Sequence, residues 1–181
     1  RGGSDMPRAV EQMRSRLGAN PVPVQLPLGA ESDFVGVMDL TRRRALIYRE
    51  ETLGATYEVA PIPEEHRDAV EDARERMVEA IAEQVDWLAE KYLADQPITE
   101  EDIRLGLREG CIAGTLHPVL CGAALRNRGI QQLLDAVLEY LPSPLDVTPP
   151  TGVEPHSRKQ VERRATEEDP LSALAFKIQS D

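Results

Sequence analysis

The side chains that most often carry chemistry, cysteine and histidine, are few and scattered in this chain. Cys111 and Cys121 lack the close spacing of a zinc ribbon or of a redox Cys-x-x-Cys motif. The three histidines, His66, His117 and His156, have no partner at metal-ligand spacing. The sequence therefore predicts two free, buried thiols and no metal site.

One short segment has the composition of a ligand-binding loop. Residues 117–121 (His-Pro-Val-Leu-Cys) are typical of a strand buried on both faces in a parallel sheet, and residues 122–125 (Gly-Ala-Ala-Leu) follow it. Small residues just past the carboxyl end of such a strand let backbone N–H groups approach a ligand. The chain offers no nucleophile-base pair and no glycine-rich phosphate loop, so we expect no catalysis by this stretch alone.

Acidic residues are concentrated in the middle of the chain. The formal net charge is -11, and residues 64–102 contain fourteen acidic and four basic side chains. Nucleic acids are bound by basic surfaces, so this acidic block is not predicted to contact them. Two interpretations remain open: a docking surface for a basic protein partner, or a solvated helix face.

The elements around these features predict a mixed α/β fold. Apolar spacing indicates a helix over residues 8–17 with Gly18 as its left-handed cap, and proline-rich alternation indicates an edge strand over residues 22–28. Three more strands are expected at 34–40, 45–48 and 56–59, which gives a small, mostly antiparallel sheet. The Arg42-Arg43-Arg44 run between two strands is interpreted as a solvated connection, because consecutive side chains on an extended segment cannot converge.

Two helices are expected to cover one face of this sheet. The first runs over residues 64–93, with an inward apolar stripe formed by Val70, Ala73, Met77, Ile81, Val85, Leu88 and Tyr92. The second begins at a capping box, Thr99 with Asp102, and ends at Gly110.

The rest of the chain predicts a βα unit, a linker and a further strand. An apolar helix over residues 130–141 follows the strand and small-residue loop. Residues 142–170 are rich in proline and mixed charge, as in an interdomain linker. Alternation at Leu174, Phe176 and Ile178 indicates a strand without neighbours, so both ends of the chain are expected to be cuts within a longer protein.

Several ordered segments resemble bacterial elongation factor G, a translational GTPase family. Residues 16–29 (Arg-Leu-Gly-Ala-Asn-Pro-Val-Pro-Val-Gln-Leu-Pro-Leu-Gly) resemble the start of its inserted subdomain. Residues 139–147 (Glu-Tyr-Leu-Pro-Ser-Pro-Leu-Asp-Val) resemble the exit from its G domain. Between them lie similar strings at 91–93, 113–114 and 118–122, and residues 174–178 are similar to the first strand of its second domain.

The resemblance implies an α/β architecture: the C-terminal part of a P-loop GTPase G domain with an inserted α+β subdomain, then a linker and the start of a β-barrel domain. The implied boundaries are 1–18 for a G-domain helix, 19–116 for the inserted subdomain and 117–147 for the last strand and helix of the G domain. Residues 148–168 are the implied linker, and 169–181 the truncated start of the second domain.

The resemblance also implies a function for the longer protein, which is GTP-dependent ribosomal translocation of tRNA and mRNA. Ala123, Ala124 and Leu125 align with the last guanine motif, where the family usually has Ser-Ala before Leu or Phe. Ala123 therefore lacks a hydroxyl that normally helps to hold the loop. The Asn-Lys-x-Asp motif would directly precede Arg1, so GTP or GDP and magnesium belong to the longer protein, and none is expected on this stretch.

The implied partners are guanine nucleotide and the ribosome, including its stalk protein. The family's inserted subdomain faces the stalk, which makes the outward acids Glu71, Glu75, Glu79, Asp86 and Glu90 partner-binding candidates. No apolar run is long enough for a membrane helix, and we expect a cytoplasmic protein. The alternatives are a freestanding acidic α+β protein-interaction module, and a ribosomal-protection or release-factor paralogue.

Overall fold

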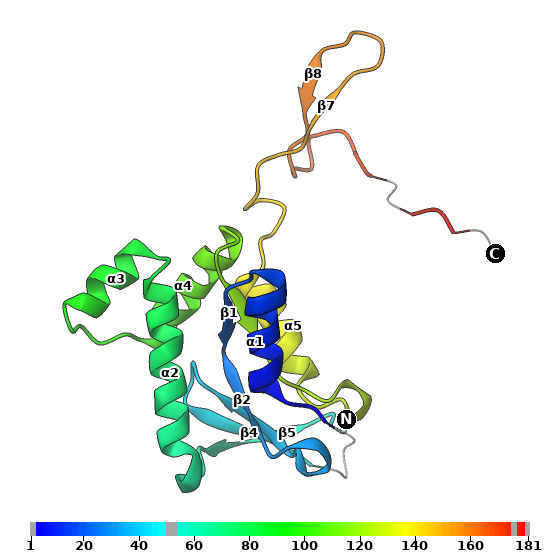
Figure 1. Cartoon of the computed structure of the whole chain (residues 1–181). Coiled ribbons are helices and arrows are strands. Elements are labelled where there is room, and N and C mark those ends of the chain that lie inside the picture. The colour runs from blue at the N-terminus through cyan, green and yellow to red at the C-terminus, as the bar shows by residue number, and fades with distance from the viewer. Residues whose placement is uncertain (1–2, 50–53, 175–176, 180–181) are drawn as a thin grey trace. The chain divides into compact units, whose positions relative to one another are not determined.

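A computed structural model describes residues 3–49, 54–174 and 177–179, in two compact units, Arg1–Leu141 and Pro142–Asp181. Figure 1 shows the helices and strands of the chain. The first unit contains α1 (Met6–Leu17), β1 (Pro21–Pro23), β2 (Gln25–Leu28), β3 (Gly36–Asp39), β4 (Arg44–Tyr48), β5 (Tyr57–Pro61), α2 (Arg67–Ala82), α3 (Asp86–Leu93), α4 (Glu100–Ile112), β6 (His117–Val119) and α5 (Ile130–Tyr140).

The four-stranded sheet β2-β3-β4-β5 is antiparallel throughout, as its alternating sequence predicts. Because successive side chains on a strand point to opposite faces, β3 and β4 each contribute to two cores. Met38 and Ala45 join the larger core on the α2 side, whereas Val37 and Leu46 join a smaller core with Cys121 and Ala123. The sheet is therefore covered on both faces, by α2 on one and by the segment after β6 on the other.

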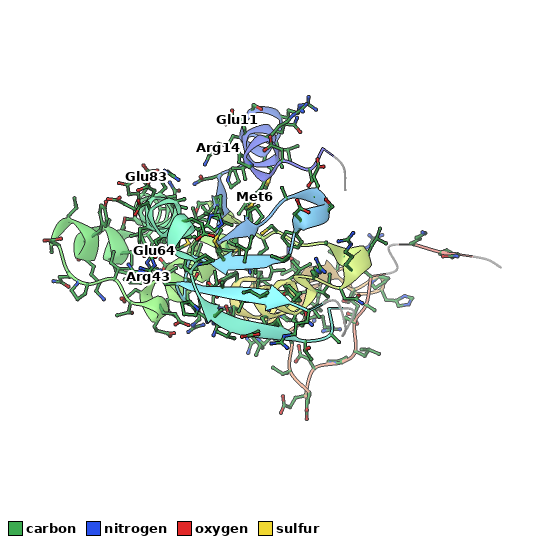
Figure 2. The ribbon with its side chains drawn as sticks, turned by 90° about the horizontal axis from the view of Figure 1, so that it is seen from below. Met6, Glu11, Arg14, Arg43, Glu64 and Glu83 are labelled. Carbon is green, nitrogen blue, oxygen red and sulfur yellow. The ribbon has the colours of Figure 1, made fainter. Side chains whose placement is uncertain are left out.

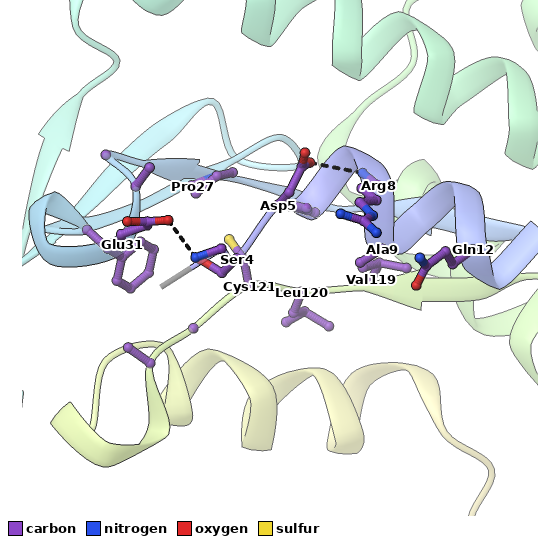
Figure 3. A pocket seen from close by; sticks show the side chains of 17 residues that line it. Ser4, Asp5, Arg8, Ala9, Gln12, Pro27, Glu31, Val119, Leu120 and Cys121 are labelled. Atoms are coloured by element: carbon purple, nitrogen blue, oxygen red, sulfur yellow. Dashed lines mark hydrogen bonds between the residues drawn. The ribbon is translucent and has the colours of Figure 1, made fainter. Parts of the chain in front are cut away.

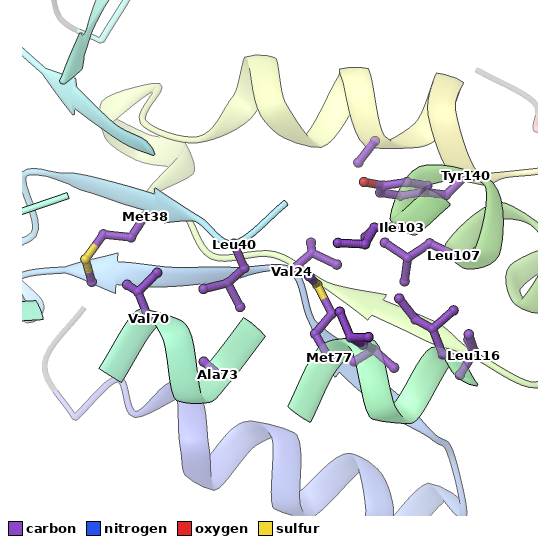
Figure 4. Close-up of a cluster of buried hydrophobic side chains, with 14 of the residues drawn as sticks. Val24, Met38, Leu40, Val70, Ala73, Met77, Ile103, Leu107, Leu116 and Tyr140 are labelled. Carbon is purple, nitrogen blue, oxygen red and sulfur yellow. The ribbon is translucent and has the colours of Figure 1, made fainter. Parts of the chain in front are cut away.

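The larger core joins the sheet to four helices, α2, α3, α4 and α5. Figure 4 shows Met38 and Leu40 facing Val70 and Ala73 of α2, with Leu107 of α4 further along the same cluster. Leu40, Val70 and Leu107 are almost fully shielded from solvent. The strongest contacts of α4 are with α2, α5 and β6, and its Ile103 and Leu107 belong to the same core cluster as Met38 and Leu40. Both α2 and α4 therefore contribute to the core on this face of the sheet.

A two-stranded parallel pair links the distant segments β1 and β6. Val22 lies opposite Pro118, and the His117 N–H donates to the Asn20 carbonyl at 2.9 Å. The parallel arrangement confirms the βα interpretation, but β6 is half-buried to exposed, so the prediction of a strand buried on both faces is wrong for the described residues. The proline-rich run predicted as one strand divides at Val24 into β1 and β2, which join different sheets.

The long acidic helix predicted over residues 64–93 is in fact a short 3-10 turn (Glu64–His66) followed by two helices. The chain turns between α2 and α3, where Val85 adopts an extended conformation (φ -132°, ψ 103°) and inserts its side chain into the core. The turn rotates α3 relative to the apolar stripe. Tyr92, predicted to be inward, is consequently 36% exposed.

Helix termini follow the sequence signals except at Gly110. Asp5 caps α1 through the Arg8 N–H, and Gly18 ends it in the left-handed region at φ 62°. Thr99 and Asp102 form the predicted capping box. Gly110 lies inside α4, where an added Cβ would be 2.4 Å from the Leu116 side chain, so this glycine permits close packing and does not end the helix.

The apolar face of α5 is largely exposed. The residues that α5 buries are Gln132, Ala136 and Tyr140, whereas Leu133, Leu134, Val137 and Leu138 are 42% to 80% exposed. The helix exists as predicted. Its leucine-rich face has no covering element among the described residues.

The second unit is a small antiparallel hairpin, β7 (Thr151–Val153) with β8 (Gln160–Glu162), within the expected linker. Leu174 and Ile178 lie in neither helix nor strand, and Phe176, the middle of the strand expected there, lies outside the described residues. None of the described helices is long and apolar enough to cross a membrane.

Candidate functional site

The loop after β6 is a closed turn. The backbones of Ala123 and Arg128 pair in both directions, at 2.8 and 3.2 Å, and Asn127 takes a left-handed conformation at φ 52° between them. A Cβ on Gly122 would lie 2.8 Å from the Arg128 carbonyl oxygen. Glycine is therefore required for the loop to close this tightly.

Side chains of the loop are anchored to the four-stranded sheet and its connections. The buried Arg128 guanidinium donates to the Phe34 carbonyl, and Gln131 Nε2 donates to the carbonyls of Gly54 and Ala55 at 3.1 and 3.2 Å. The Tyr48 hydroxyl of β4 donates to Gln132 Oε1. The segment 19–116 thus supports the loop whose backbone would face a ligand.

The three candidate guanine-binding residues lie together at the surface of this turn. Ala124 and Leu125 are exposed, and Ala123 is half-buried. The Ala124 N–H has no hydrogen-bond partner among the described residues, although its carbonyl accepts from the Asn127 N–H at 3.0 Å. An unpaired backbone donor on an exposed residue is suited to an acceptor on a ligand.

A cavity of about 590 Å³ lies beside this loop. Figure 3 shows it between the start of α1, with Asp5 and Arg8, and the β6 end, with Leu120 and Cys121. The Gly3 N–H donates to Glu31 Oε1 at 2.6 Å across one side of it. The first described residues of the chain and the loop after β6 therefore share one cavity.

Both cysteines are free, as predicted, but each is half-buried. Burial raises the pKa of the Cys121 thiol to about 12 and raises that of Cys111 as well. A thiol is nucleophilic as its thiolate, so neither residue is activated at neutral pH. The described residues contain no cluster of three or more His, Cys, Asp or Glu side chains that could hold a metal ion.

The five acidic candidates are all exposed and lie on two helices. Glu71, Glu75 and Glu79 lie on α2, and Asp86 and Glu90 lie on α3 beyond the turn. Glu71 is paired with Arg43 at 3.0 Å, and Glu79 accepts a hydrogen bond from the Tyr92 hydroxyl at 3.1 Å. Two of the five carboxylates are therefore already engaged within the chain.

A groove of about 670 Å³ lies alongside α2. Glu71 and Glu75 line it together with Val78, Tyr92 and Leu93, and the Leu93 side chain is 85% exposed. The acidic surface therefore has an apolar component, which the sequence pattern did not indicate because the stripe through Tyr92 fitted the core. Asp86, directly after Val85, was the available sequence signal that a new helix begins here, since acidic residues are favoured in the first turn of a helix.

The arginine run diverges as predicted, yet it is not merely a solvated connection. Arg43 reaches Glu71, whereas Arg42 reaches Glu100 at 2.8 Å and Glu139 at 3.0 Å. Burial lowers the pKa of Arg42, but the hydrogen bond to Glu139 and nearby carboxylate charges outweigh it and raise the pKa overall. These arginines join separate elements of the unit.

The structure thus defines a mixed α/β protein with small antiparallel sheets and a surface loop after a parallel strand. No protein-family model matches the chain. It is 46% identical over 182 residues to elongation factor G from Amoebophilus asiaticus (strain 5a2), a match that covers 100% of this chain and 26% of that relative. A crystal structure of a Thermus thermophilus protein is similar with a TM-score of 0.69 and 33% identity, covering 82% of this chain and 22% of that one.

The chain belongs to the elongation factor G family, as the resemblance in its motifs predicted. It spans about a quarter of the length of the curated relative that it matches.

Proposed function

We propose that this chain is part of an elongation factor G-like GTPase that moves tRNA and mRNA through the ribosome with GTP hydrolysis in the cytoplasm. In this proposal residues 1–18 and 117–147 belong to the G domain, residues 19–116 form its inserted subdomain, and residues 148–168 and 169–181 are the linker and the start of a β-barrel domain. The observation that carries the proposal is 46% identity to elongation factor G along the whole chain.

Within that protein, the loop at Ala123, Ala124 and Leu125 would form one side of the guanine pocket. The unpaired Ala124 N–H would donate to the guanine carbonyl oxygen, a contact that depends on backbone position and not on the side chain. Ala123 has no hydroxyl to hold the loop. Its backbone pairing with Arg128, together with the Arg128 contact to Phe34, supplies an alternative restraint.

GTP or GDP and magnesium would be held mainly by other parts of the longer protein. One hydrogen bond contributes only about 0.5–1.5 kcal/mol, far below the roughly 8 kcal/mol of micromolar binding. We therefore expect isothermal titration calorimetry of the 181-residue chain to show no saturable GTP or GDP binding at micromolar concentration. Saturable binding would contradict this division of the pocket.

The loop itself is tested in a longer protein that carries the complete G domain. Ala124→Pro removes the proposed donor, and proline is tolerated at the start of a helical turn after an extended residue such as Ala123 (φ -128°, ψ 85°). GDP affinity should fall by up to about tenfold, the equivalent of one hydrogen bond. Ala124→Ser is the matched control and should leave affinity unchanged, because it keeps the backbone donor at the same position; equal affinity for Ala124→Pro would exclude the proposed contact.

The acidic residues of α2 and α3 would serve as the docking surface for the basic face of a ribosomal stalk protein. The groove beside α2 supports this role, since it combines Glu71 and Glu75 with the exposed apolar side chains Tyr92 and Leu93. Interfaces commonly combine an apolar centre with a charged rim. Charge would act mainly on the rate of encounter, and the apolar groove on the lifetime of the complex.

A further inference from the structure

A second groove of the first unit has no part in either proposed site. It has a volume of about 460 Å³ and lies between α1, the β1–β2 segment, β3 and α2. Its floor is formed by apolar side chains, which are Met6, Pro7, Val10, Val22, Leu26 and Met77 together with Met38. Both the volume and the apolar floor are typical of small-molecule sites, whose volumes are about 300–1,000 Å³.

The charged residues that line this groove are all basic. They are Arg14 of α1 and Arg76 of α2; His66, just before α2, also lines the groove, and no aspartate or glutamate is among the lining residues. In Figure 2, Arg14 lies on α1 toward α2, whereas Glu11 lies on the outer side of α1. In a chain of net charge -11, an apolar groove with an exclusively basic rim is a local reversal of charge.

These basic groups are available to a ligand. The Arg76 side chain has no hydrogen bond or ion pair with any described residue, and the Arg14 contact to the Pro21 carbonyl is long, at 3.5 Å. Both arginines are exposed. An anionic group placed between them would gain charge-assisted hydrogen bonds while its apolar part occupied the floor.

We propose that this groove binds a small anionic amphiphile, a molecule with an apolar chain or ring system and one carboxylate or sulfonate. The apolar floor favours the body of such a ligand, and Met6, Met38 and Met77 adapt readily to its shape because methionine side chains are flexible and polarizable. Arg14 and Arg76 recognise the anionic end. A cationic or neutral ligand of the same size lacks the favourable interaction with Arg14 and Arg76.

The methionines make the proposal directly testable. The chain has four methionines, and three of them line the groove, whereas Met13 does not. In the 181-residue chain with carbon-13 in its methionine methyl groups, decanoate added below its micelle concentration should shift the Met6, Met38 and Met77 signals saturably. The Met13 signal should remain in place and serves as the internal reference.

Variants and a neutral analogue of decanoate separate the contribution of the apolar floor from that of the basic rim. Ala69→Trp, at an exposed position on α2 that lines the groove, should abolish the saturable shifts by filling it. Arg76→Glu should weaken decanoate binding by about tenfold, the scale of one charge-assisted hydrogen bond, and should leave the weaker binding of decanol unchanged. Arg16→Glu, on α1 but outside the groove, makes the same charge change and should have no effect.

Each other outcome overturns the proposal. Equal affinity for decanoate and decanol would show that the basic rim contributes nothing. Shifts of all four methionines with altered circular dichroism would show that decanoate acts as a denaturing detergent. Absence of any saturable shift, with all variants folded, would show that the groove takes no anionic amphiphile, and saturable binding retained by Ala69→Trp would place the ligand elsewhere.

Discussion

Arg42 Nη2 donates a hydrogen bond to Oε1 of Glu139 over 3.0 Å, joining two residues that lie 97 positions apart. The same guanidinium contacts Glu100 through Nε at 2.8 Å. One side chain therefore connects the β3–β4 turn with α4 and α5, the helix that follows the candidate guanine loop.

Arg42→Leu should destabilise the unit by about 1.5–3 kcal/mol, since it leaves Glu139 without its charged partner in a half-buried position. Urea denaturation followed by circular dichroism measures this loss. Arg43→Leu is the matched control, because the Arg43–Glu71 pair is exposed on both sides, and it should cost no more than about 1 kcal/mol. Equal losses of unfolding free energy in the two variants would mean that the contacts of Arg42 with α4 and α5 add nothing to the stability of the unit.

Gly122→Ala should open the loop at the candidate guanine site. Its new Cβ would lie 2.8 Å from the Arg128 carbonyl, so the Ala123–Arg128 pairing must shift, at a cost of about 1–3 kcal/mol. Because burial holds the Cys121 thiol protonated by raising its pKa, we also expect faster labelling of Cys121 by a thiol reagent in this variant. Gly152→Ala has open space around its Cβ and should change neither stability nor labelling.

Asp102 should make the stability of α4 depend on pH in the acidic range. Partial burial raises its pKa, but hydrogen bonds from Lys91 and Thr99 outweigh this effect and lower it from 3.8 to about 2. The carboxylate is therefore favoured in the folded state, so its contribution is complete above about pH 4 and is lost as the pH falls toward 2. Asp102→Asn should remove this part of the acid dependence in denaturation curves at about pH 2 to 5, whereas Glu90→Gln, at an exposed position on α3, should retain it.

Local sequence rules predicted the features that depend on neighbouring residues. The capping box at Thr99, the left-handed cap at Gly18 and the antiparallel strands all follow from side chains within a few positions. The break before α3 could not be predicted, because Val85 fits an uninterrupted helical stripe as well as it fits the core after a turn. Tertiary packing decides between these two arrangements.

The sequence predicted the position of the candidate site but not the contacts that anchor its loop. Small residues after an apolar strand indicated the loop at Ala123, whereas the anchoring of Arg128 to Phe34 joins residues 94 positions apart. A buried arginine has no local signature, since its partners are backbone carbonyls from a remote turn. The apolar pattern of α5 predicted a helix, but periodicity alone does not specify whether the apolar face is covered within this chain.

Reversal of three outward acidic charges should slow partner association in the full-length protein. Glu75→Lys, Glu79→Lys and Asp86→Lys together should reduce the rate of stalk-dependent GTP turnover on ribosomes by about tenfold at low salt, and less at physiological salt where the screening length is about 8 Å. Intrinsic nucleotide affinity should be unchanged. The control is a triple variant with the same charge change at Glu11, Glu167 and Glu168. If the two triple variants had equal rates of GTP turnover, the acidic residues of α2 and α3 would be a solvated face and not a docking surface.

The groove beside α2 suggests a second variant that separates charge from apolar contact. Leu93→Ser removes an exposed apolar side chain without changing charge, so it should shorten the lifetime of the stalk complex while the association rate stays the same. Surface plasmon resonance with immobilised stalk protein distinguishes the two rates. A change confined to the association rate would contradict the assigned role of the groove.

The pairing of β1 with β6 has a consequence for the order in which the chain folds. Strands β2 to β5 pair with their neighbours in sequence, so their hairpins close short loops at low entropic cost. The pair of Val22 with Pro118 instead closes a loop containing the whole sheet and three helices. We therefore expect the intervening sheet and helices to fold early in refolding, and the register of β1 with β6, on which the loop at Ala123 depends, to form last.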